Sequence, residues 1–297
     1  MRARFIVALL AALFAAVPAM AQEKLKVVAT FSILGDLAKN VGGERVDITM
    51  LVGPNGDAHV YNPSPADARK LADARVVVMN GLGFEGWIAR LVKASGSKAP
   101  VVVATKGVAP RKPEGGHSHG HAHNDPHAWQ SVPNVKIYVA NIRDALIAAD
   151  PAGKVAYESN STAYLAKLDA LDAEVRDTVA KIPAERRRII TTHDAFGYFR
   201  QAYGVEFVAP QGVSTESEAS ARDVARIITQ IKRQKIPAVF MENVSDPRLL
   251  KQISDETGAR IGGTLYSDAL TDEKGPAPTY IDLIRHNIRT LSAALLS

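Results

Sequence analysis

Three histidines and one aspartate stand in loops or at the ends of predicted strands, where they could bind a metal ion. His59 lies in a loop after a short apolar run, and His193 directly follows a β-branched run. His127 follows Pro126, whose ring fixes the backbone just before the imidazole. Asp268 comes soon after the last predicted strand. Three imidazoles and one carboxylate form the ligand set of a closed tetrahedral Zn²⁺ site, and the chain has no cysteine that could offer a thiolate.

Three of these residues also have an ordinary structural interpretation. His59 could be an exposed loop residue, His193 a hydrogen-bonded histidine of the core, and Asp268 the N-cap of a helix. His286 lies inside a predicted helix and is interpreted as a surface residue outside any site. No local spacing forces the four candidate ligands together, so the metal interpretation depends on a fold that brings them to one place.

A second group of histidines lies in residues 111–124. Its imidazoles alternate with small residues, so this segment cannot pack a core and is expected to form a loop. Alternating imidazoles can chelate Zn²⁺ weakly, and we predict an auxiliary metal-binding loop. The alternatives are a solvated spacer with incidental metal affinity and a docking segment for a donor protein. The residues concerned are His117, His119, His121 and His123.

Other polar residues could support the main site. Asp125 could accept a hydrogen bond from the ring of a ligating histidine, and Glu242 could face the same crevice from the end of a strand. Either could instead cap a helix or contact water, and the same holds for three residues that could line the rim. These are Thr215, Glu216 and Glu218.

Residues 1–21 are typical of a secretory signal peptide. Arg2 and Arg4 precede an apolar run from Phe5 to Pro18, and Ala19-Met20-Ala21 is a cleavage-type ending. The apolar run is shorter than the roughly 20 residues that cross a bilayer. Because the chain has no cysteine, we expect neither a lipid anchor nor a disulfide, and we predict a soluble periplasmic protein.

Short β-branched runs alternate with helical patterns along the remaining chain, which predicts an α/β fold with two lobes. Each lobe is expected to contain a roughly four-stranded parallel sheet flanked by helices. We place the N-terminal lobe at residues 22–150, a linking helix at 151–182 and the C-terminal lobe at 183–297. Open parallel sheets bind ligands at the carboxyl ends of their strands, so we expect a site in the crevice between the lobes.

The predicted elements follow from these patterns. The strands are Leu25–Thr30, Val46–Leu51, Arg75–Met79, Val101–Ala104, Arg188–Thr192, Val205–Ala209, Ala238–Met241 and Ala259–Leu265. The helices lie near Ile33–Val41, Pro65–Ala72, Phe84–Ala94, Ala195–Tyr203, Ala219–Gln234 and Pro247–Thr257.

The linking segment is predicted to be one long rigid helix. Asp150-Pro151 suits a helix start and Pro183 suits its end. A helix of about 30 residues would extend about 45 Å, long enough to support both lobes. Its inward residues recur at spacings of three and four: Tyr157, Ser161, Tyr164, Leu168, Leu171 and Val175.

The composition argues against a nucleic-acid partner. The formal net charge of +5 is mild, and no run of Lys and Arg stands out. Hydrophobic residues make up 46% and charged residues 23%, which is typical of a globular protein with real cores. We expect a monomer.

Four segments around the candidate ligands carry a resemblance to a known family. They are Asp57-Ala58-His59-Val60-Tyr61-Asn62-Pro63-Ser64-Pro65, Asp125-Pro126-His127-Ala128-Trp129, Thr192-His193-Asp194-Ala195-Phe196-Gly197-Tyr198-Phe199 and Ser267-Asp268-Ala269-Leu270. They resemble the ligand motifs of the periplasmic zinc- and manganese-binding proteins of metal-uptake ABC transporters, the cluster A-I solute-binding family. Residues 80–87 resemble a further family segment, interpreted as structural. The resemblance covers nearly the whole mature chain, implies two lobes joined by a backbone helix, and assigns ligand roles to His59, His127, His193 and Asp268.

The resemblance implies a protein that captures a metal ion in the periplasm and delivers it to a membrane permease, and it does not imply an enzyme. Manganese-type members generally have Glu at the third ligand position, whereas this chain has His193. Nitrogen ligands favour Zn²⁺ over Mn²⁺. Zinc-type members often carry a His-rich insertion and are commonly described with three His plus a water or Glu. We therefore predict one tight Zn²⁺ site, and we consider a periplasmic metallochaperone as a possible donor.

Three other functions are alternatives to zinc capture. A manganese carrier would use the same fold. A zinc hydrolase would need an open coordination position and a general base, and the chain has no HExxH motif. A surface adhesin is disfavoured because no cysteine could carry a lipid. Since a ligating imidazole must be neutral, zinc affinity is expected to fall as the pH drops below about 6.5.

Overall fold

The computed structural model describes residues 23–113 and 124–296. The predicted signal peptide at residues 1–21 and the four histidines predicted to form an auxiliary metal site lie outside the described residues. Within the described ranges, no helix combines the length and the apolar character needed to cross a bilayer.

The N-terminal lobe contains a four-stranded parallel sheet with the strand order β2-β1-β3-β4. Three strand pairs are in parallel register, with Val28 opposite Thr49 in β2 and opposite Val77 in β3. Its elements are β1 (Leu25–Phe31), α1 (Ser32–Gly42), β2 (Val46–Val52), α2 (Pro65–Ala72), β3 (Val76–Met79), α3 (Ile88–Ser95), β4 (Val101–Val103), the 3-10 turn η2 (Ala128–Gln130) and α4 (Val132–Ala149).

The C-terminal lobe repeats this arrangement with the strand order β6-β5-β7-β8, also parallel. In each sheet the first strand in the sequence lies between the second and the third, so the chain leaves it toward one edge and later crosses to the other. Open α/β sheets bind ligands at such a switch point. Its elements are β5 (Arg188–Ile190), α6 (Gly197–Tyr203), β6 (Glu206–Val208), α7 (Ala221–Gln234), β7 (Ala238–Glu242), α8 (Pro247–Thr257), β8 (Arg260–Leu265) and α9 (Tyr280–Leu296).

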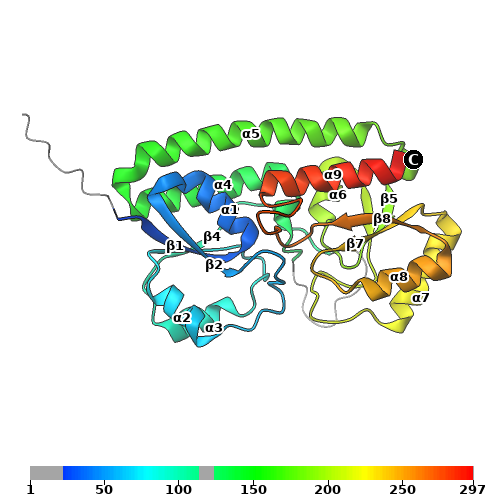
Figure 1. The fold of residues 1–297 in the computed structure, drawn as a ribbon, viewed down its shortest axis with the longest axis horizontal. Coiled ribbons are helices and arrows are strands. Elements are labelled where there is room, and N and C mark those ends of the chain that lie inside the picture. The colour runs from blue at the N-terminus through cyan, green and yellow to red at the C-terminus, as the bar shows by residue number, and fades with distance from the viewer. Residues whose placement is uncertain (1–22, 114–123, 297) are drawn as a thin grey trace, which may run out of the picture.

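Helix α5 (Lys154–Ala180) joins the lobes and runs along the edge of the molecule above both of them (Figure 1). It has 27 residues and is therefore about 40 Å long. Helix α9 packs along it from the C-terminal lobe and reaches α1, where the Tyr280 backbone N–H donates to Asp36 Oδ2 at 3.0 Å. The buried residues of α5 are the six predicted to face inward, together with Val179: Tyr157, Ser161, Tyr164, Leu168, Leu171 and Val175.

Local sequence signals explain several helix boundaries. Ser64 caps α2 in a capping box with Asp67, and Pro65 occupies the first turn. Asp246 caps α8 by accepting the Arg248 backbone N–H at 2.8 Å. These caps set the residue at which each helix begins and therefore where the preceding loop ends.

The structure differs from the expected elements in two ways. Helix α4 was not predicted, although six of its side chains are buried in the core. The segment expected to be helical from Phe84 begins its helix only at Ile88, and the one expected from Ala195 begins at Gly197. In both cases the residues before the helix form a loop that contacts the site described below.

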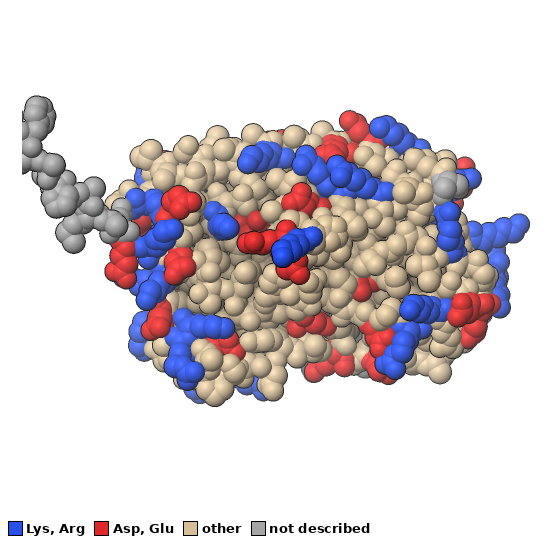
Figure 2. Space-filling view, in the orientation of Figure 1, with Lys and Arg blue, Asp and Glu red and all other residues tan. Residues whose placement is uncertain are grey.

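Charged side chains of both signs are interspersed on the face drawn in Figure 2.

Candidate metal centre

Four potential metal ligands from distant parts of the chain meet between the two lobes. They are His59, His127, His193 and Asp268, and their ligand atoms all lie within 4.8 Å of one another. The distance from His193 Nε2 to Asp268 Oδ2 is 3.1 Å, and that from His59 Nε2 to His127 Nε2 is 3.2 Å. Ligand atoms bound tetrahedrally to one Zn²⁺ are separated by about 3.3–3.5 Å. The spacing therefore fits a single cation.

The four side chains are almost fully withdrawn from solvent. The His59 side chain is 4% exposed and the other three are 0% exposed. The Asp268 carboxylate faces imidazoles, with His193 Nε2 at 3.1 Å and His59 Nε2 at 3.4 Å from its Oδ2. A buried carboxylate of this kind is stabilised by positive charge, which a protonated imidazole or a bound metal ion supplies. The donor set and its burial thus suit a divalent cation.

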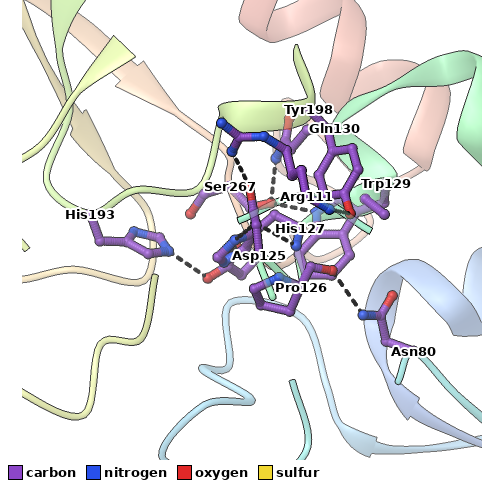
Figure 3. A network of polar contacts seen from close by, with 12 residues as sticks. Asn80, Arg111, Asp125, Pro126, His127, Trp129, Gln130, His193, Tyr198 and Ser267 are labelled. Carbon is purple, nitrogen blue, oxygen red and sulfur yellow. Dashed lines mark hydrogen bonds and ion pairs between the residues drawn. The ribbon is translucent and has the colours of Figure 1, made fainter. Parts of the chain in front are cut away.

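The loop formed by residues 80–87 holds both ligands of the N-terminal lobe. Trp87 Nε1 donates at 2.8 Å to the carbonyl oxygen of the residue before His59. Asn80 Nδ2 donates at 2.9 Å to the carbonyl oxygen of the residue before His127 (Figure 3). One rigid loop therefore sets the position of two imidazoles.

The same loop places an aromatic ring against these imidazoles. The Phe84 ring centroid lies 4.6 Å from that of His59 and 6.1 Å from that of His127. The loop is held by the buried carboxylate of Glu85, which accepts a hydrogen bond from Thr30 Oγ1 at 2.7 Å and bonds from two backbone N–H groups of the loop. Burial raises the pKa of Glu85 despite these donors. This loop keeps the imidazole faces in an apolar setting.

His193 and Asp268 follow strands β5 and β8 of the C-terminal lobe, with short loops in between. The carbonyl oxygen of Ser267 accepts hydrogen bonds from Trp129 Nε1 at 2.8 Å and from Gln130 Nε2 at 2.7 Å (Figure 3). Trp129 and Gln130 belong to turn η2 of the N-terminal lobe, directly after the His127 ligand. The two lobes are therefore hydrogen-bonded to each other beside the ligands.

Two further carboxylates lie against the outer nitrogens of two imidazoles. Asp125 Oδ1 is 2.8 Å from His127 Nδ1, and Glu242 Oε2 is 2.6 Å from His193 Nδ1. Glu242 Oε1 also accepts the backbone N–H of His193 at 3.0 Å. A carboxylate that accepts from Nδ1–H fixes the ring and leaves Nε2 as the metal-binding nitrogen.

The charges of the site are strongly coupled. Burial disfavours a charged His193, but the carboxylates of Glu242 and Asp268 outweigh burial and hold the pKa of His193 well above its usual value. Burial alone would raise the pKa of Asp268, but His193 and His127 hold it well below its usual range. Burial lowers the pKa of His59. In the absence of a cation, the structure thus favours an ion pair between protonated His193 and ionised Asp268.

The three residues predicted to line the rim, and His286, do not share one environment. Thr215 Oγ1 donates to Asp57 Oδ2 at 2.6 Å and so connects the C-terminal lobe to the loop that carries His59. Glu216 and Glu218 are exposed. The interpretation of His286 as a surface residue is wrong, because this side chain is partly buried, with its Nε2 3.0 Å from the Thr264 carbonyl oxygen.

Sequence reasoning missed one charged residue of the site, Arg111. Its Nη1 lies 2.5 Å from Asp125 Oδ2. The two residues are separated by the His-rich segment, and no local pattern pairs residues across such a loop.

Replacing Glu242 with glutamine is expected to weaken Zn²⁺ binding by about 10- to 100-fold, the usual cost of losing a partner of a ligating histidine. Glutamine keeps an oxygen for the backbone N–H groups but removes the charge beside His193. The pH dependence of binding should weaken as well, because the pKa of His193 is no longer raised by this carboxylate. Competition with a chelating dye measures both effects, with Glu206→Gln on the surface of β6 as the control. Unchanged affinity in Glu242→Gln would show that this carboxylate does not support the ligand.

Comparison with known proteins reveals extensive similarity. The family described as "ZnuA: Zinc-uptake complex component A periplasmic" matches residues 27–294. The chain is 38% identical over 275 residues to the iron-binding protein YfeA of Yersinia pestis, covering 93% of this chain and 88% of that protein. It is 37% identical over 274 residues to the manganese-binding lipoprotein MntA of Halalkalibacterium halodurans, covering 92% and 89%.

A solved structure shares the fold as well as the sequence. The periplasmic zinc-binding protein TroA from Treponema pallidum superimposes with a TM-score of 0.85 at 34% identity, covering 92% of this chain and 99% of that one. The two lobes with their parallel sheets and long linking helix are therefore an arrangement seen in a solved relative.

Proposed function

This chain belongs to the ZnuA family of periplasmic metal-binding components of uptake transporters, and we propose that it captures Zn²⁺ between its lobes and delivers it to a membrane permease. The observation that carries the choice of zinc is the donor set, three imidazoles and one carboxylate within 4.8 Å. Imidazole suits Zn²⁺, whereas Mn²⁺ prefers oxygen ligands, and the Irving–Williams order adds to this preference. As a solute-binding component, the protein transports its ligand and is not an enzyme.

A manganese carrier is the second candidate. It is favoured by the 37% identity to a protein named for manganese binding and by the carboxylate of Asp268, an oxygen donor. Against it stands His193, which supplies a nitrogen at the third ligand position. The zinc hydrolase considered from the sequence is not retained, because the family consists of transport components.

Metal competition separates zinc from manganese. The protein is stripped of metal, mixed with equal concentrations of Zn²⁺ and Mn²⁺, and analysed by native mass spectrometry. We expect one Zn²⁺ per chain and no retained Mn²⁺. A parallel variant lacking residues 115–123 tests the proposed auxiliary site, since it should keep the tight ion and lose any weaker ones. Retention of Mn²⁺ by the cleft in preference to Zn²⁺ would overturn the zinc assignment.

We propose that capture and release follow from the division of the ligands between the lobes. His59 and His127 come from one lobe, and His193 and Asp268 from the other. Moving the lobes apart, or withdrawing the loop that carries His59, would break the ligand shell and expose the ion. A closed shell of four protein ligands leaves no open position for catalysis, which is consistent with transport.

We place the protein in the periplasm, where a permease of the same transporter would receive the ion. The expectation that no lipid anchors it stays a prediction, and some relatives are named lipoproteins. Loading by a metallochaperone and a monomeric state likewise stay predictions.

Zinc affinity is expected to increase about tenfold per pH unit across the neutral range. Zn²⁺ must displace the proton of His193, because the raised pKa keeps this imidazole protonated above the ordinary value of about 6.5. The pKa of His59 is lowered, so this imidazole is already neutral in that range. Zn²⁺ has to displace a second proton, that of His59, only at more acidic pH. Dye competition between about pH 6 and pH 8, corrected for protonation of the dye, measures the slope. A flat profile above about pH 6.5 would contradict the charged His193.

A further inference from the structure

We propose that Arg111 is a positioning residue for metal capture, because one side chain ties the loop of His127 in the N-terminal lobe to the start of helix α6 in the C-terminal lobe. The inference rests on the proposed capture of a cation between the lobes. It concerns a residue that acts on the ligands through Asp125 and α6.

The two oxygens of the Asp125 carboxylate have different partners. Arg111 Nη1 lies 2.5 Å from Asp125 Oδ2, whereas Asp125 Oδ1 is 2.8 Å from His127 Nδ1. Asp125 Oδ1 also accepts the His127 backbone N–H at 3.0 Å. The Arg111 side chain is 13% exposed and that of Asp125 is 0% exposed, so the ion pair is well shielded from water. With both oxygens engaged, the carboxylate can rotate little, and the imidazole of His127 is held in one orientation.

The backbone of Arg111 is fixed at the same place. Its carbonyl oxygen accepts the Asp125 backbone N–H at 2.8 Å, so the ends of the intervening segment meet here. Its own backbone N–H donates to Tyr198 Oη at 3.1 Å. The guanidinium carbon lies 5.8 Å from the centroid of the Tyr198 ring, within the range of a cation–π contact (Figure 3). Arg111 is therefore held by Asp125 in the N-terminal lobe and by Tyr198 in the C-terminal lobe.

The guanidinium group of Arg111 packs directly against Gly197 on α6. A Cβ atom at this position would overlap Arg111 Nη1 and would lie 2.6 Å from Asp125 Oδ2. The close approach thus requires a residue without a side chain, and it occurs four residues after His193. Arg111 consequently fixes the relative placement of the segments that carry His127 and His193, which belong to different lobes.

Arg111→Gln is expected to weaken binding of the metal that the wild-type protein retains by about 10- to 100-fold. Arg111→Lys, which keeps the charge, should recover part of this loss. The matched control is Arg176→Gln: Arg176 also pairs with an aspartate and lies over a tyrosine ring, 5.2 Å from its centroid, but on α5 away from the site. Thermal unfolding of the metal-free variants verifies that each is folded.

A spectroscopic measurement separates positioning from simple packing. In ¹⁵N spectra of metal-free protein, the neutral form of His127 should carry its proton on Nδ1, facing Asp125. Arg111→Gln should shift this population toward the other tautomer, and Arg176→Gln should not. An unchanged tautomer together with unchanged affinity would overturn the proposal.

Gly197→Ala provides a second, independent test. The added methyl group should displace Arg111 and lower affinity to a similar extent, and the double variant with Arg111→Gln should lose little more than either single variant. Fully additive losses would contradict a shared role.

All measurements are made with Zn²⁺ and with Mn²⁺. If the wild type prefers Mn²⁺, the zinc assignment fails, whereas the role of Arg111 fails only if its variants bind the preferred ion as tightly as the wild type.

Discussion

Replacing His193 with alanine is expected to weaken Zn²⁺ binding by roughly two to three orders of magnitude. Four-ligand zinc sites bind with about 10–16 kcal/mol, so one ligand contributes about 2.5–4 kcal/mol, and each 1.4 kcal/mol is a factor of ten. His193 is fully buried, and its Nε2 is 3.1 Å from Asp268 Oδ2, so no solvent-exposed neighbour can take its place easily. Dye competition measures the loss.

His286→Ala is the matched control for this experiment. His286 is also a partly buried histidine of the C-terminal lobe, but its Nε2 contacts the Thr264 carbonyl oxygen and not the site. This variant should bind Zn²⁺ as the wild type does. Wild-type affinity in His193→Ala would mean that the cation binds elsewhere.

Asp268→Asn is expected to cause a loss of about a thousandfold, at least as large as that of His193→Ala. Asp268 is the single anionic ligand of the set, and its 0% exposed carboxylate offsets the charge of the buried cation. An amide keeps the shape but leaves that charge uncompensated in a buried site, which is costly.

Thermal unfolding with and without Zn²⁺ measures the effect of Asp268→Asn, because a ligand that binds only the folded state raises the melting temperature according to its affinity. Zn²⁺ should stabilise the wild type strongly and this variant far less. Asp150→Asn removes a carboxylate that pairs with Arg45 at the far end of the N-terminal lobe, and its zinc-induced shift should stay that of the wild type. An equal zinc-induced shift in Asp268→Asn would exclude the carboxylate as a ligand.

Much of the fold was predictable because its signals are local. The β-branched runs give the eight strands within one or two residues at most ends, and the spacing of Tyr157, Tyr164 and Leu171 identified the buried face of α5. Helix α4 was missed, although it packs against α5, α1 and two strands of the N-terminal sheet. Packing against these tertiary neighbours, rather than local propensity alone, stabilises this helix.

The site was less accessible to local reasoning. The ligand-type residues could be named from their places in loops or after strands and from the family resemblance of their motifs, but their convergence depends on contacts between segments up to about 200 residues apart. The supporting contacts also join separate segments, 29, 46 and 14 residues apart: Trp87 donates to the loop of His59, Asn80 donates to that of His127, and Arg111 pairs with Asp125. No local sequence pattern predicts these pairs, because each contact forms only when the segments pack together in the folded protein.

The most direct test is anomalous diffraction at the zinc edge from crystals of the protein grown with one equivalent of Zn²⁺. The account predicts one strong peak between the lobes, about 2.0–2.2 Å from His59 Nε2, His127 Nε2, His193 Nε2 and an oxygen of Asp268. A zinc peak bound elsewhere, with these four side chains uncoordinated, would contradict it.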